Sequence, residues 1–212
     1  RGRLSIHLSR KLIHTGTGPV FVLCWLLFDH STLSPYLAAL VPFAITLQFL
    51  LVGLGVMRDE AAVKALSRSG DRREILKGPL YYGIIFVLLT ILYWKNSPIG
   101  MIALMVLSGG DGLADIIGRR FGKHKLPWNQ GKSWAGSLGM FLGAWGFSLL
   151  VLWVYHAVGI FPQPVGAYLL PVTLISLDCT LVETLPVKDM DNITITLTAL
   201  LLSALPVRAD DL

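Results

Sequence analysis

Charged residues are scarce in this chain of 212 residues. Asp, Glu, Lys and Arg together make up 15% of it, whereas 54% of the residues are hydrophobic. Soluble domains carry roughly 25% charged residues, so the composition argues against a water-soluble globular fold. Long, nearly uncharged runs separated by short polar segments are instead typical of proteins whose helices cross a bilayer.

Cysteine is also rare. The chain contains only Cys24 and Cys179, and both lie within apolar runs with no spacing that suggests pairing. A disulfide-stapled fold and a cysteine-rich metal site are therefore not expected, and we predict that both residues are small buried hydrophobic side chains. The sequence likewise lacks internal repeats and low-complexity segments.

The apolar runs predict seven membrane-spanning helices, because about 20 apolar residues are needed to cross a bilayer. We therefore expect an all-α fold: a polytopic helical membrane protein with about seven transmembrane helices in one bundle, forming a single integral-membrane domain over 1–212. The predicted spans lie near 16–29, 34–57, 78–95, 97–117, 134–158, 165–186 and 193–207.

The basic residues gather on one side of this topology. All but two of the 18 lysines and arginines fall in the N-terminal segment 1–15, in the loops 58–77 and 118–133, or at Lys188. This bias predicts that the basic side is cytoplasmic, or stromal in a plastid. The net charge of +5 thus reports membrane topology, and a nucleic acid partner is not expected. Lys95 lies on the opposite side, so its substitution is expected to leave activity nearly intact.

The loop 58–77 is predicted to form an amphipathic helix followed by a turn at Ser69, Gly70 and Asp71. Two interpretations remain open. The segment either rests on anionic headgroups as a solvated connector, or its arginines help to hold phosphates.

Two aspartates at the end of the fourth predicted span are the most unusual feature. Asp111, Asp115, Gly118 and Gly122 are spaced so that, at about 100° per residue, they share one helix stripe, and Ala114 lies beside it. One interpretation is a small-residue packing face. The other is a magnesium–nucleotide site, because Mg²⁺ is bound by one or two carboxylates together with substrate phosphates.

A basic run follows the stripe and suits the phosphate interpretation. Lys132 and Ser133 open the fifth predicted span, where a lysine can meet a phosphate aided by helix N-terminal amides. A P-loop is rejected because its upstream glycine is missing. The basic residues expected to neutralise phosphate charge are Arg119, Arg120, Lys123, Lys125 and Lys132.

A second acidic cluster lies on the same predicted side. Glu183 falls just inside the sixth span, and Asp189, Asp191 and Asn192 follow in the loop before the seventh. The loop acids are either solvated residues and a helix cap or, with Asp111 and Asp115, part of a metal site. Glu183 is the sharper candidate, because a carboxylate at the membrane border needs a partner.

The N-terminal segment offers a third group of candidates. Arg10, Lys11 and His14 occupy successive turns ahead of the first span. They either anchor the chain on the basic side of the membrane or join the phosphate site.

The run from Asp111 to Gly122 matches D-x-x-A-x-x-x-G-x-x-x-G at every fixed position. It resembles the CTP-binding motif of the dolichol and polyprenol kinases, within the wider group that includes the CDP-diacylglycerol synthases. "NQGKSWAGSLGMF" at 129–141 resembles the segment that follows this motif in both branches. "RKLIHTGTG" at 10–18, "LKGPLYY" at 76–82 and "VETLPVKDMDNITI" at 182–195 resemble the phytol and farnesol kinase branch in particular.

The resemblance implies phosphorylation of an isoprenoid alcohol, phytol or a shorter prenol, by CTP or UTP with Mg²⁺. The product would serve phytol salvage for tocopherol-type prenylquinones, in a chloroplast membrane or in a cyanobacterial cell or thylakoid membrane.

We expect Asp111 and Asp115 to bind the metal, Lys132 with Arg119 or Arg120 to neutralise charge, and Glu183 or Asp191 to accept the alcohol proton. Two interpretations remain for the aromatic residues at the start of the fifth predicted span: they contact the prenyl chain of the substrate, or they are ordinary lipid-facing or packing residues. They are Trp134, Phe141 and Trp145. Oligomeric state stays open.

Two alternative functions remain compatible with the sequence. The first is a CTP-dependent lipid cytidylyltransferase like the CDP-diacylglycerol synthases, although the histidine and paired glycines that mark their C-terminal segment are absent here. The second is a cation-coupled transporter, which the lack of a repeat and the position of the acids at one border disfavour.

Overall fold

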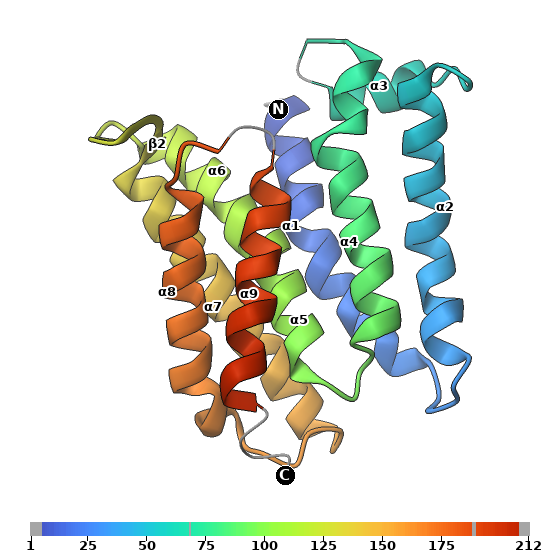
Figure 1. Cartoon of the computed structure of the whole chain (residues 1–212), viewed down its shortest axis with the longest axis vertical. Coiled ribbons are helices and arrows are strands. Elements are labelled where there is room, and N and C mark those ends of the chain that lie inside the picture. Colours follow the sequence, from blue (N-terminus) through green and yellow to red (C-terminus); the bar gives the residue numbers. More distant parts are fainter. Residues whose placement is uncertain (1–5, 68, 188–189, 208–212) are drawn as a thin grey trace, which may run out of the picture.

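Helices arranged side by side make up nearly the whole structure, a computed structural model that describes residues 6–67, 69–187 and 190–207 (Figure 1). The all-α prediction is confirmed. The elements are α1 (Ile6–Cys24), α2 (Ser34–Leu54), α3 (Glu60–Leu66), α4 (Gly78–Leu92), α5 (Pro98–Met105), α6 (Asp111–Phe121), β1 (Lys125–Leu126), β2 (Asn129–Ser133), α7 (Trp134–Ala157), α8 (Leu169–Glu183) and α9 (Asp191–Val207). Short 3-10 turns at Trp25–Leu27, Arg72–Leu76 and Val165–Tyr168 extend α1, α4 and α8.

Five helical segments of the described chain are long and apolar enough to cross a membrane. They are Ser34–Leu54, Arg72–Leu92, Pro98–Phe121, Trp134–Ala157 and Val165–Glu183. The first and last predicted spans correspond to two shorter apolar helices, Lys11–Leu27 and Asp191–Ser203. The total of seven spans therefore stays a prediction.

Two helix boundaries and one predicted loop differ from the sequence-based expectation. The first helix begins at Ile6 rather than near residue 16, and Lys11 and His14 within it contact Asp111 of the bundle. The fourth predicted span continues to Phe121. The predicted basic loop 118–133 thus starts as a helix, and its remainder folds into an antiparallel hairpin that pairs Lys125 with Ser133 and Leu126 with Asn129.

The segment Pro98–Phe121 is the buried centre of the bundle. Each residue from Met101 to Leu107 is at most 1% exposed. A π-helical segment at Val106–Gly110 joins α5 to α6, so the chain enters α6 with Asp111 as its first residue. Burial of the part that precedes α6 fixes the direction in which the α6 side chains project.

Glycines set the close crossing of this central segment with α7. A Cβ on Gly143 would collide with the carbonyl oxygen of Gly109 and come within 3.2 Å of Gly110 Cα. A Cβ on Gly139 would lie 2.8 Å from the carbonyl oxygen of Leu113. Small residues permit such backbone approach between membrane helices. This crossing is thus a small-residue packing contact, made by residues outside the stripe of Asp111, Asp115, Gly118 and Gly122.

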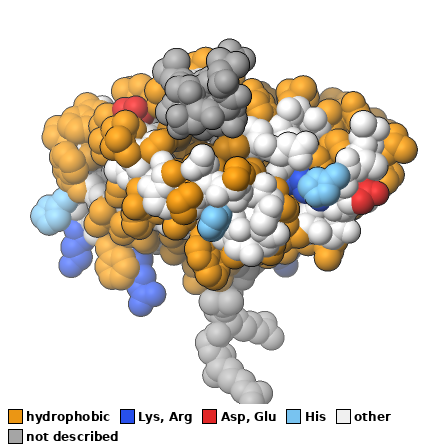
Figure 2. All heavy atoms as spheres, turned by 90° about the horizontal axis from the view of Figure 1, so that it is seen from below, with side chains coloured by type: hydrophobic (Ala, Val, Ile, Leu, Met, Phe, Trp, Pro, Cys, Tyr) orange, Lys and Arg blue, Asp and Glu red, His pale blue; other side chains and the backbone are white. Residues whose placement is uncertain are grey.

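The two ends of the bundle differ in charge. The hairpin, α3 and the start of α1 lie at one end (Figure 1), and the sequence ranges to which they belong, 1–15, 58–77 and 118–133, carry 15 of the 18 lysines and arginines. The opposite end is mostly hydrophobic with few charged side chains (Figure 2). The structure thus agrees with the basic side inferred from the loop charges.

Lys95 lies at the apolar end of the bundle, where its side chain is buried. Its residue is 2% exposed, its ammonium donates a hydrogen bond to the carbonyl oxygen of Phe28, and the same group lies 5.9 Å from the centroid of the Trp94 ring. Lys95 therefore ties the end of α1 to the loop before α5.

We predict that Lys95→Ala destabilises the protein, because it leaves a cavity and an unpaired buried carbonyl at Phe28. The expected loss is about 1–3 kcal/mol, seen as a lower Tm of the detergent-purified protein. Activity of the folded fraction should persist. Lys64→Ala, on the exposed face of α3, is the matched control, and an equal Tm for the two variants would contradict the anchoring role of Lys95.

We also predict opposite effects for two glycines of α7. Gly143→Ala should lower stability by about 1–3 kcal/mol, because its methyl group overpacks the crossing with Gly109. Gly146→Ala meets no atom within 4 Å, so the better helix propensity of alanine should leave stability unchanged or raise it by up to about 1 kcal/mol. Thermal unfolding of both variants measures the contrast.

Candidate active site

A polar pocket of about 470 Å³ opens at the hairpin end of the bundle. Its walls come from α1, α6, the hairpin, the start of α7, the last residue of α8 and the first residue of α9. The volume lies within the range of small-molecule sites. The lining residues are Lys11, Asp111, Ala114, Asp115, Gly118, Arg119, Gly122, Lys125, Gly131, Lys132, Ser133, Gly136, Ser137, Glu183 and Asp191.

Asp111 is held by two side chains of α1. Its Oδ2 lies 3.2 Å from Lys11 Nζ and 3.2 Å from His14 Nε2. The imidazole of His14 stacks at 4.3 Å on the ring of Tyr82, whose hydroxyl donates a 2.9 Å hydrogen bond to the carbonyl oxygen of His14. The early start of α1 therefore explains how Lys11 and His14 reach the pocket carboxylate.

Asp115 lies one helical turn after Asp111 and belongs to the outer part of the pocket. Its Oδ1 accepts a 3.0 Å bond from Arg119 Nε, a pairing four residues apart on α6. The Arg119 side chain is 57% exposed, so this cation is free to move toward an anion in the pocket. Asp111 and Asp115 thus line one wall, as the stripe predicted.

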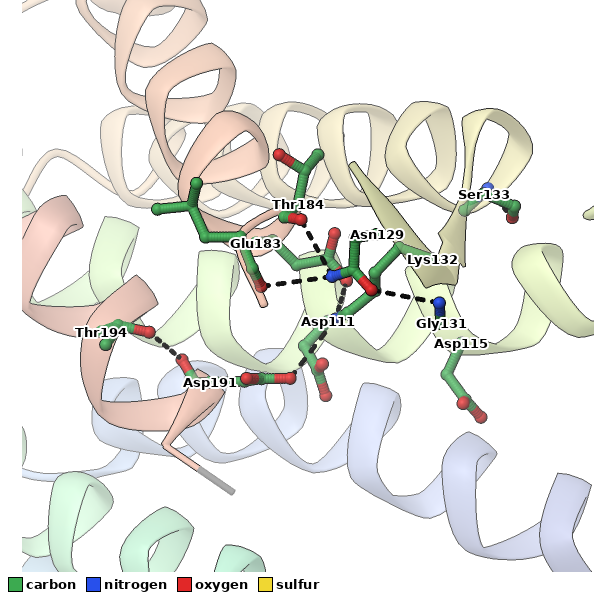
Figure 3. A network of polar contacts seen from close by, with 12 residues as sticks. Asp111, Asp115, Asn129, Gly131, Lys132, Ser133, Glu183, Thr184, Asp191 and Thr194 are labelled. Carbon is green, nitrogen blue, oxygen red and sulfur yellow. Dashed lines mark hydrogen bonds and ion pairs between the residues drawn. The ribbon is translucent and has the colours of Figure 1, made fainter. Parts of the chain in front are cut away.

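Lys132 joins three elements at the inner end of the pocket. Its ammonium forms an ion pair with Glu183 Oε1 at the end of α8 and lies 3.3 Å from Asp191 Oδ2 at the start of α9. Figure 3 shows Asp111, Glu183 and Asp191, from three different helices, gathered around the end of the Lys132 side chain. The cation and the acids thus meet although they lie far apart in the sequence.

The pKa of Lys132 is raised above its ordinary value of 10.5. Burial acts to lower it, but the negative charges of Glu183, Asp191 and Asp111 outweigh that effect. A raised pKa means that the stabilisation from protonated Lys132 is complete at neutral pH and is lost only as the pH rises through that raised value. The pocket therefore keeps a fixed positive charge under physiological conditions.

Asn129 connects the hairpin to the end of α8 by hydrogen bonds. Its side-chain nitrogen donates to the carbonyl oxygens of Thr184 at 3.0 Å and Leu185 at 3.3 Å. These two hydrogen bonds hold β2 beside the end of α8 and so place Lys132 next to Glu183. No sequence pattern marked Asn129 for such a role.

Ser133 acts as the N-cap of α7, accepting a 3.1 Å bond from the amide of Gly136. The amide of Trp134 donates to the carbonyl oxygen of His124 at 3.2 Å. Two of the first amides of α7 are thus satisfied within the chain. The expectation that helix N-terminal amides help Lys132 to bind a phosphate gains no support from these two groups.

The glycines of the α6 stripe serve both packing and the pocket. A Cβ on Gly118 would lie 3.3 Å from Gly136 Cα, and one on Gly122 would collide with Ser133 and the carbonyl oxygen of Gly118. These residues also line the pocket, as does Ala114. The two interpretations of the stripe are therefore compatible.

Several predicted site residues lie elsewhere. Arg120 is exposed and its guanidinium lies 5.5 Å from the centroid of the Phe121 ring, and Lys123 is exposed beyond α6. Neither lines the pocket. Arg120 comes five residues after Asp115, and at about 100° per residue it points about 140° away from the shared stripe. Asn192 instead donates a 3.0 Å bond to the carbonyl oxygen of Gly78. The side chain of Arg10, and Lys188 with Asp189, lie outside the described residues.

Lys125, one of the basic residues expected to neutralise phosphate charge, lines the pocket from β1. Gly131, Gly136 and Ser137, which were not predicted as site residues, complete the wall. Only the hairpin brings Lys125 and Gly131 there. The sequence signal that could have identified Gly131, Gly136 and Ser137 is the resemblance of 129–141, which spans β2 and the start of α7.

The donor set is compatible with a magnesium–phosphate complex. Within the described residues, no three His, Cys, Asp or Glu side chains converge to bind a metal by themselves. Mg²⁺ needs fewer protein ligands, since it is usually bound by one or two carboxylates plus phosphates and water. Asp111 and Asp115, hard oxygen donors one turn apart on the pocket wall, suit that mode of binding.

A comparison with curated proteins finds similar chains of plants. This chain is 43% identical over 200 residues to a protein named probable phytol kinase, chloroplastic, of Triticum aestivum, covering 93% of this chain and 67% of the relative. It is 45% identical over 203 residues to farnesol kinase, chloroplastic, of Arabidopsis thaliana (95% and 66%) and 41% identical over 196 residues to phytol kinase 1, chloroplastic, of the same plant (92% and 64%).

The chain thus spans about two thirds of the length of these relatives. No protein-family model matches it, and no solved structure gives a significant match.

We predict that Lys132→Met destabilises the protein, because Glu183 and Asp191 would lose their shared cation. Breaking a buried ion pair costs about 3–5 kcal/mol, and the value here should fall near the lower end because the Lys132 side chain is 26% exposed. The double variant Lys132→Met/Glu183→Gln should be less destabilised than the sum of the two, by about 0.5–3 kcal/mol. Thermal unfolding measures both, with exposed Lys125→Met as the control. Strict additivity would contradict the coupling.

Proposed function

The chain belongs to the family of the chloroplastic phytol and farnesol kinases, and we propose that it transfers a phosphoryl group from a nucleoside triphosphate to the hydroxyl of an isoprenoid alcohol. The observation that carries this proposal is the pocket itself, in which three acids surround Lys132 at one end of a bundle of apolar helices. A charged, water-borne donor and an alcohol dissolved in the bilayer can meet only at such a border.

The cations of the pocket suit a triphosphate. Lys11 reaches the pocket from α1 and Lys132 from β2, and the more exposed Arg119 and Lys125 also line it. Phosphoryl transfer depends mainly on positioning and on stabilising the charge of the transferred group. Lys132, whose pKa is raised by its acidic neighbours, supplies a constant positive charge for that purpose.

The carboxylates of α6 are the proposed metal ligands. Asp111 and Asp115 would hold Mg²⁺ together with the phosphates of the donor. When bound, the metal neutralises phosphate charge and orients the transferred group. Lys11 and His14 hold Asp111 in place, and Arg119 holds Asp115, so the wall is ordered before the nucleotide arrives.

The reaction itself needs few chemical groups from the protein. The alcohol oxygen attacks the terminal phosphorus in line with the leaving diphosphate, and the hydroxyl proton passes to a carboxylate of the pocket, Glu183 or Asp191. The charge that shifts onto the leaving group is met by Lys132 and by Arg119. The apolar outer face of α7, which includes the exposed Trp134, is a candidate wall for the hydrocarbon chain.

The finer assignments follow the family. We propose CTP or UTP as the donor and phytol as the preferred acceptor, with farnesol and geranylgeraniol as shorter alternatives. The product would enter prenylquinone synthesis by phytol salvage. The relatives are named chloroplastic, and the apolar helices suit an integral membrane protein, so we propose a chloroplast membrane as its location.

The assay uses detergent-purified protein, Mg²⁺ and CTP or UTP labelled on the γ-phosphate, with phytol, geranylgeraniol, farnesol, dolichol or phosphatidic acid as the acceptor. We expect label in a prenyl monophosphate, no transfer after chelation of Mg²⁺, and recovery when Mg²⁺ is restored. Release of the label in pyrophosphate with phosphatidic acid would identify a cytidylyltransferase and overturn the proposal.

We predict that Asp115→Asn lowers kcat with phytol by at least about 100-fold, because the amide is a poor ligand for a hard cation. Asp29→Asn, in the loop between α1 and α2 at the opposite end of the bundle, removes a carboxylate charge outside the pocket and should keep wild-type turnover. Retained turnover in Asp115→Asn would refute the assignment of this residue.

A further inference from the structure

Glu183 has the least exposed side chain of the four pocket acids, and one of its carboxylate oxygens is satisfied by no described group. Its side chain is 4% exposed, and its Oε1 receives the ion pair from Lys132. Its Oε2 is buried and receives no hydrogen bond from any residue that the structure describes. Buried polar atoms normally have a partner, so such an oxygen on a pocket wall calls for an explanation.

A ligand of the pocket is the natural partner for this oxygen. The carboxylate of Glu183 lines the pocket, and a buried charged oxygen is unfavourable unless a donor reaches it. Phosphate oxygens are negatively charged acceptors and are repelled by it. The matching group is a hydroxyl, and the proposed reaction offers two sources: the acceptor alcohol and the ribose of the nucleotide.

The position of Glu183 favours the acceptor alcohol. It is the last residue of the membrane-length segment Val165–Glu183, so its carboxylate lies where an apolar helix meets the polar pocket. An alcohol anchored in the bilayer by its hydrocarbon chain presents its hydroxyl at this depth. Asp111, on the central helix α6, faces the same region (Figure 3) and is assigned to the metal, so the hydroxyl would lie between Glu183 and the bound phosphates.

The neighbouring acids are less suited to this role. Asp191 has a side chain that is 33% exposed and bonded to Lys132 through Oδ2. Asp111 Oδ2 is already paired with Lys11 and His14. The charged groups that face Glu183 are Lys132, Asp191 and Asp111.

We propose that Glu183 is the catalytic base for the acceptor: Oε2 accepts the hydrogen bond of the alcohol hydroxyl and takes its proton during transfer. This inference rests on the proposed function. The alcohol oxygen forms a bond to the γ-phosphorus while the bond from that phosphorus to the β,γ-bridging oxygen breaks. The bonding electrons leave with the nucleoside diphosphate, and the proton on Oε2 is later released to water. Lys132 on Oε1 orients the carboxylate.

The first test compares two variants that each neutralise one acid bonded to Lys132. Glu183→Gln keeps the size of the side chain and an oxygen for Lys132, but it cannot take a proton. We expect its kcat with phytol to fall by about 10²–10⁴-fold, with KM for the nucleotide within about threefold of wild type. Asp191→Asn should lose less than about tenfold in kcat. An equal loss in both variants, or an active Glu183→Gln, overturns the proposal.

The second test varies the acidity of the acceptor. A prenol analogue with fluorine next to the carbinol carbon has a more acidic hydroxyl and depends less on a base. The deficit of Glu183→Gln relative to wild type should shrink by about tenfold or more with this analogue. A deficit that stays the same for both alcohols indicates a merely structural role and overturns the proposal.

The third test separates the two sources of the hydroxyl. If Oε2 binds the acceptor, 2′-deoxy and 3′-deoxy nucleotides should weaken wild type and Glu183→Gln by the same factor. If the variant is insensitive to loss of one ribose hydroxyl while wild type is impaired, Glu183 binds the nucleotide, and the proposal is wrong.

Thermal unfolding and binding of a non-hydrolysable nucleotide serve as controls that each variant is folded. Should Glu183→Gln not fold, Glu183→Asp keeps the charge but withdraws the carboxylate by one methylene. We expect at least a tenfold loss of kcat for it, and full activity overturns the proposal. Wild-type protein that phosphorylates none of the alcohols overturns the proposed function as well, whereas an active wild type with an unaffected Glu183→Gln overturns this inference alone.

Discussion

Carboxylates at the border of a membrane bundle must be paired, and the polar end of this protein is built around that constraint. An ionised group away from water is unfavourable unless opposite charge and hydrogen bonds compensate. Asp111 is compensated by Lys11 and His14, and Glu183 by Lys132. Each pair joins elements distant in the sequence, so the same contacts that neutralise the acids also bring α1, α6, the hairpin and α8 to one place.

Close helix packing makes this arrangement possible at the end of the bundle. The glycine crossing between the central segment and α7, seen at Gly109 and Gly143, continues to Gly118 and Gly136 at the pocket. The hairpin then leads directly into α7, with Ser133 as its N-cap. The backbone approach of α6 and α7 therefore fixes the position of Lys132 relative to Asp111, and the small residues shape the pocket as well as the fold.

The sequence predicted the features that depend on local pattern. Apolar runs located the helices, and the spacing of Asp111 and Asp115 placed both on one wall of the pocket. The hairpin was missed because strands of two and five residues, one containing Gly131 and Lys132, show no alternating pattern. The burial of Lys95 and the hydrogen bonds of Asn129 were missed because each depends on a carbonyl group from a distant part of the chain.

The same constraint explains why one acid can differ from the rest. A fully compensated network would be rigid and chemically inert, because each carboxylate would already hold its hydrogen bonds. Lys132 compensates the charge of Glu183 through one oxygen and leaves the other without a hydrogen bond from the described residues. On this one side chain, Oε1 takes part in the ion pair and Oε2 can still accept a hydrogen bond. An acid arranged in this way is paired with a cation at a membrane border and still has an oxygen that can accept a hydrogen bond from a hydroxyl group arriving from the bilayer.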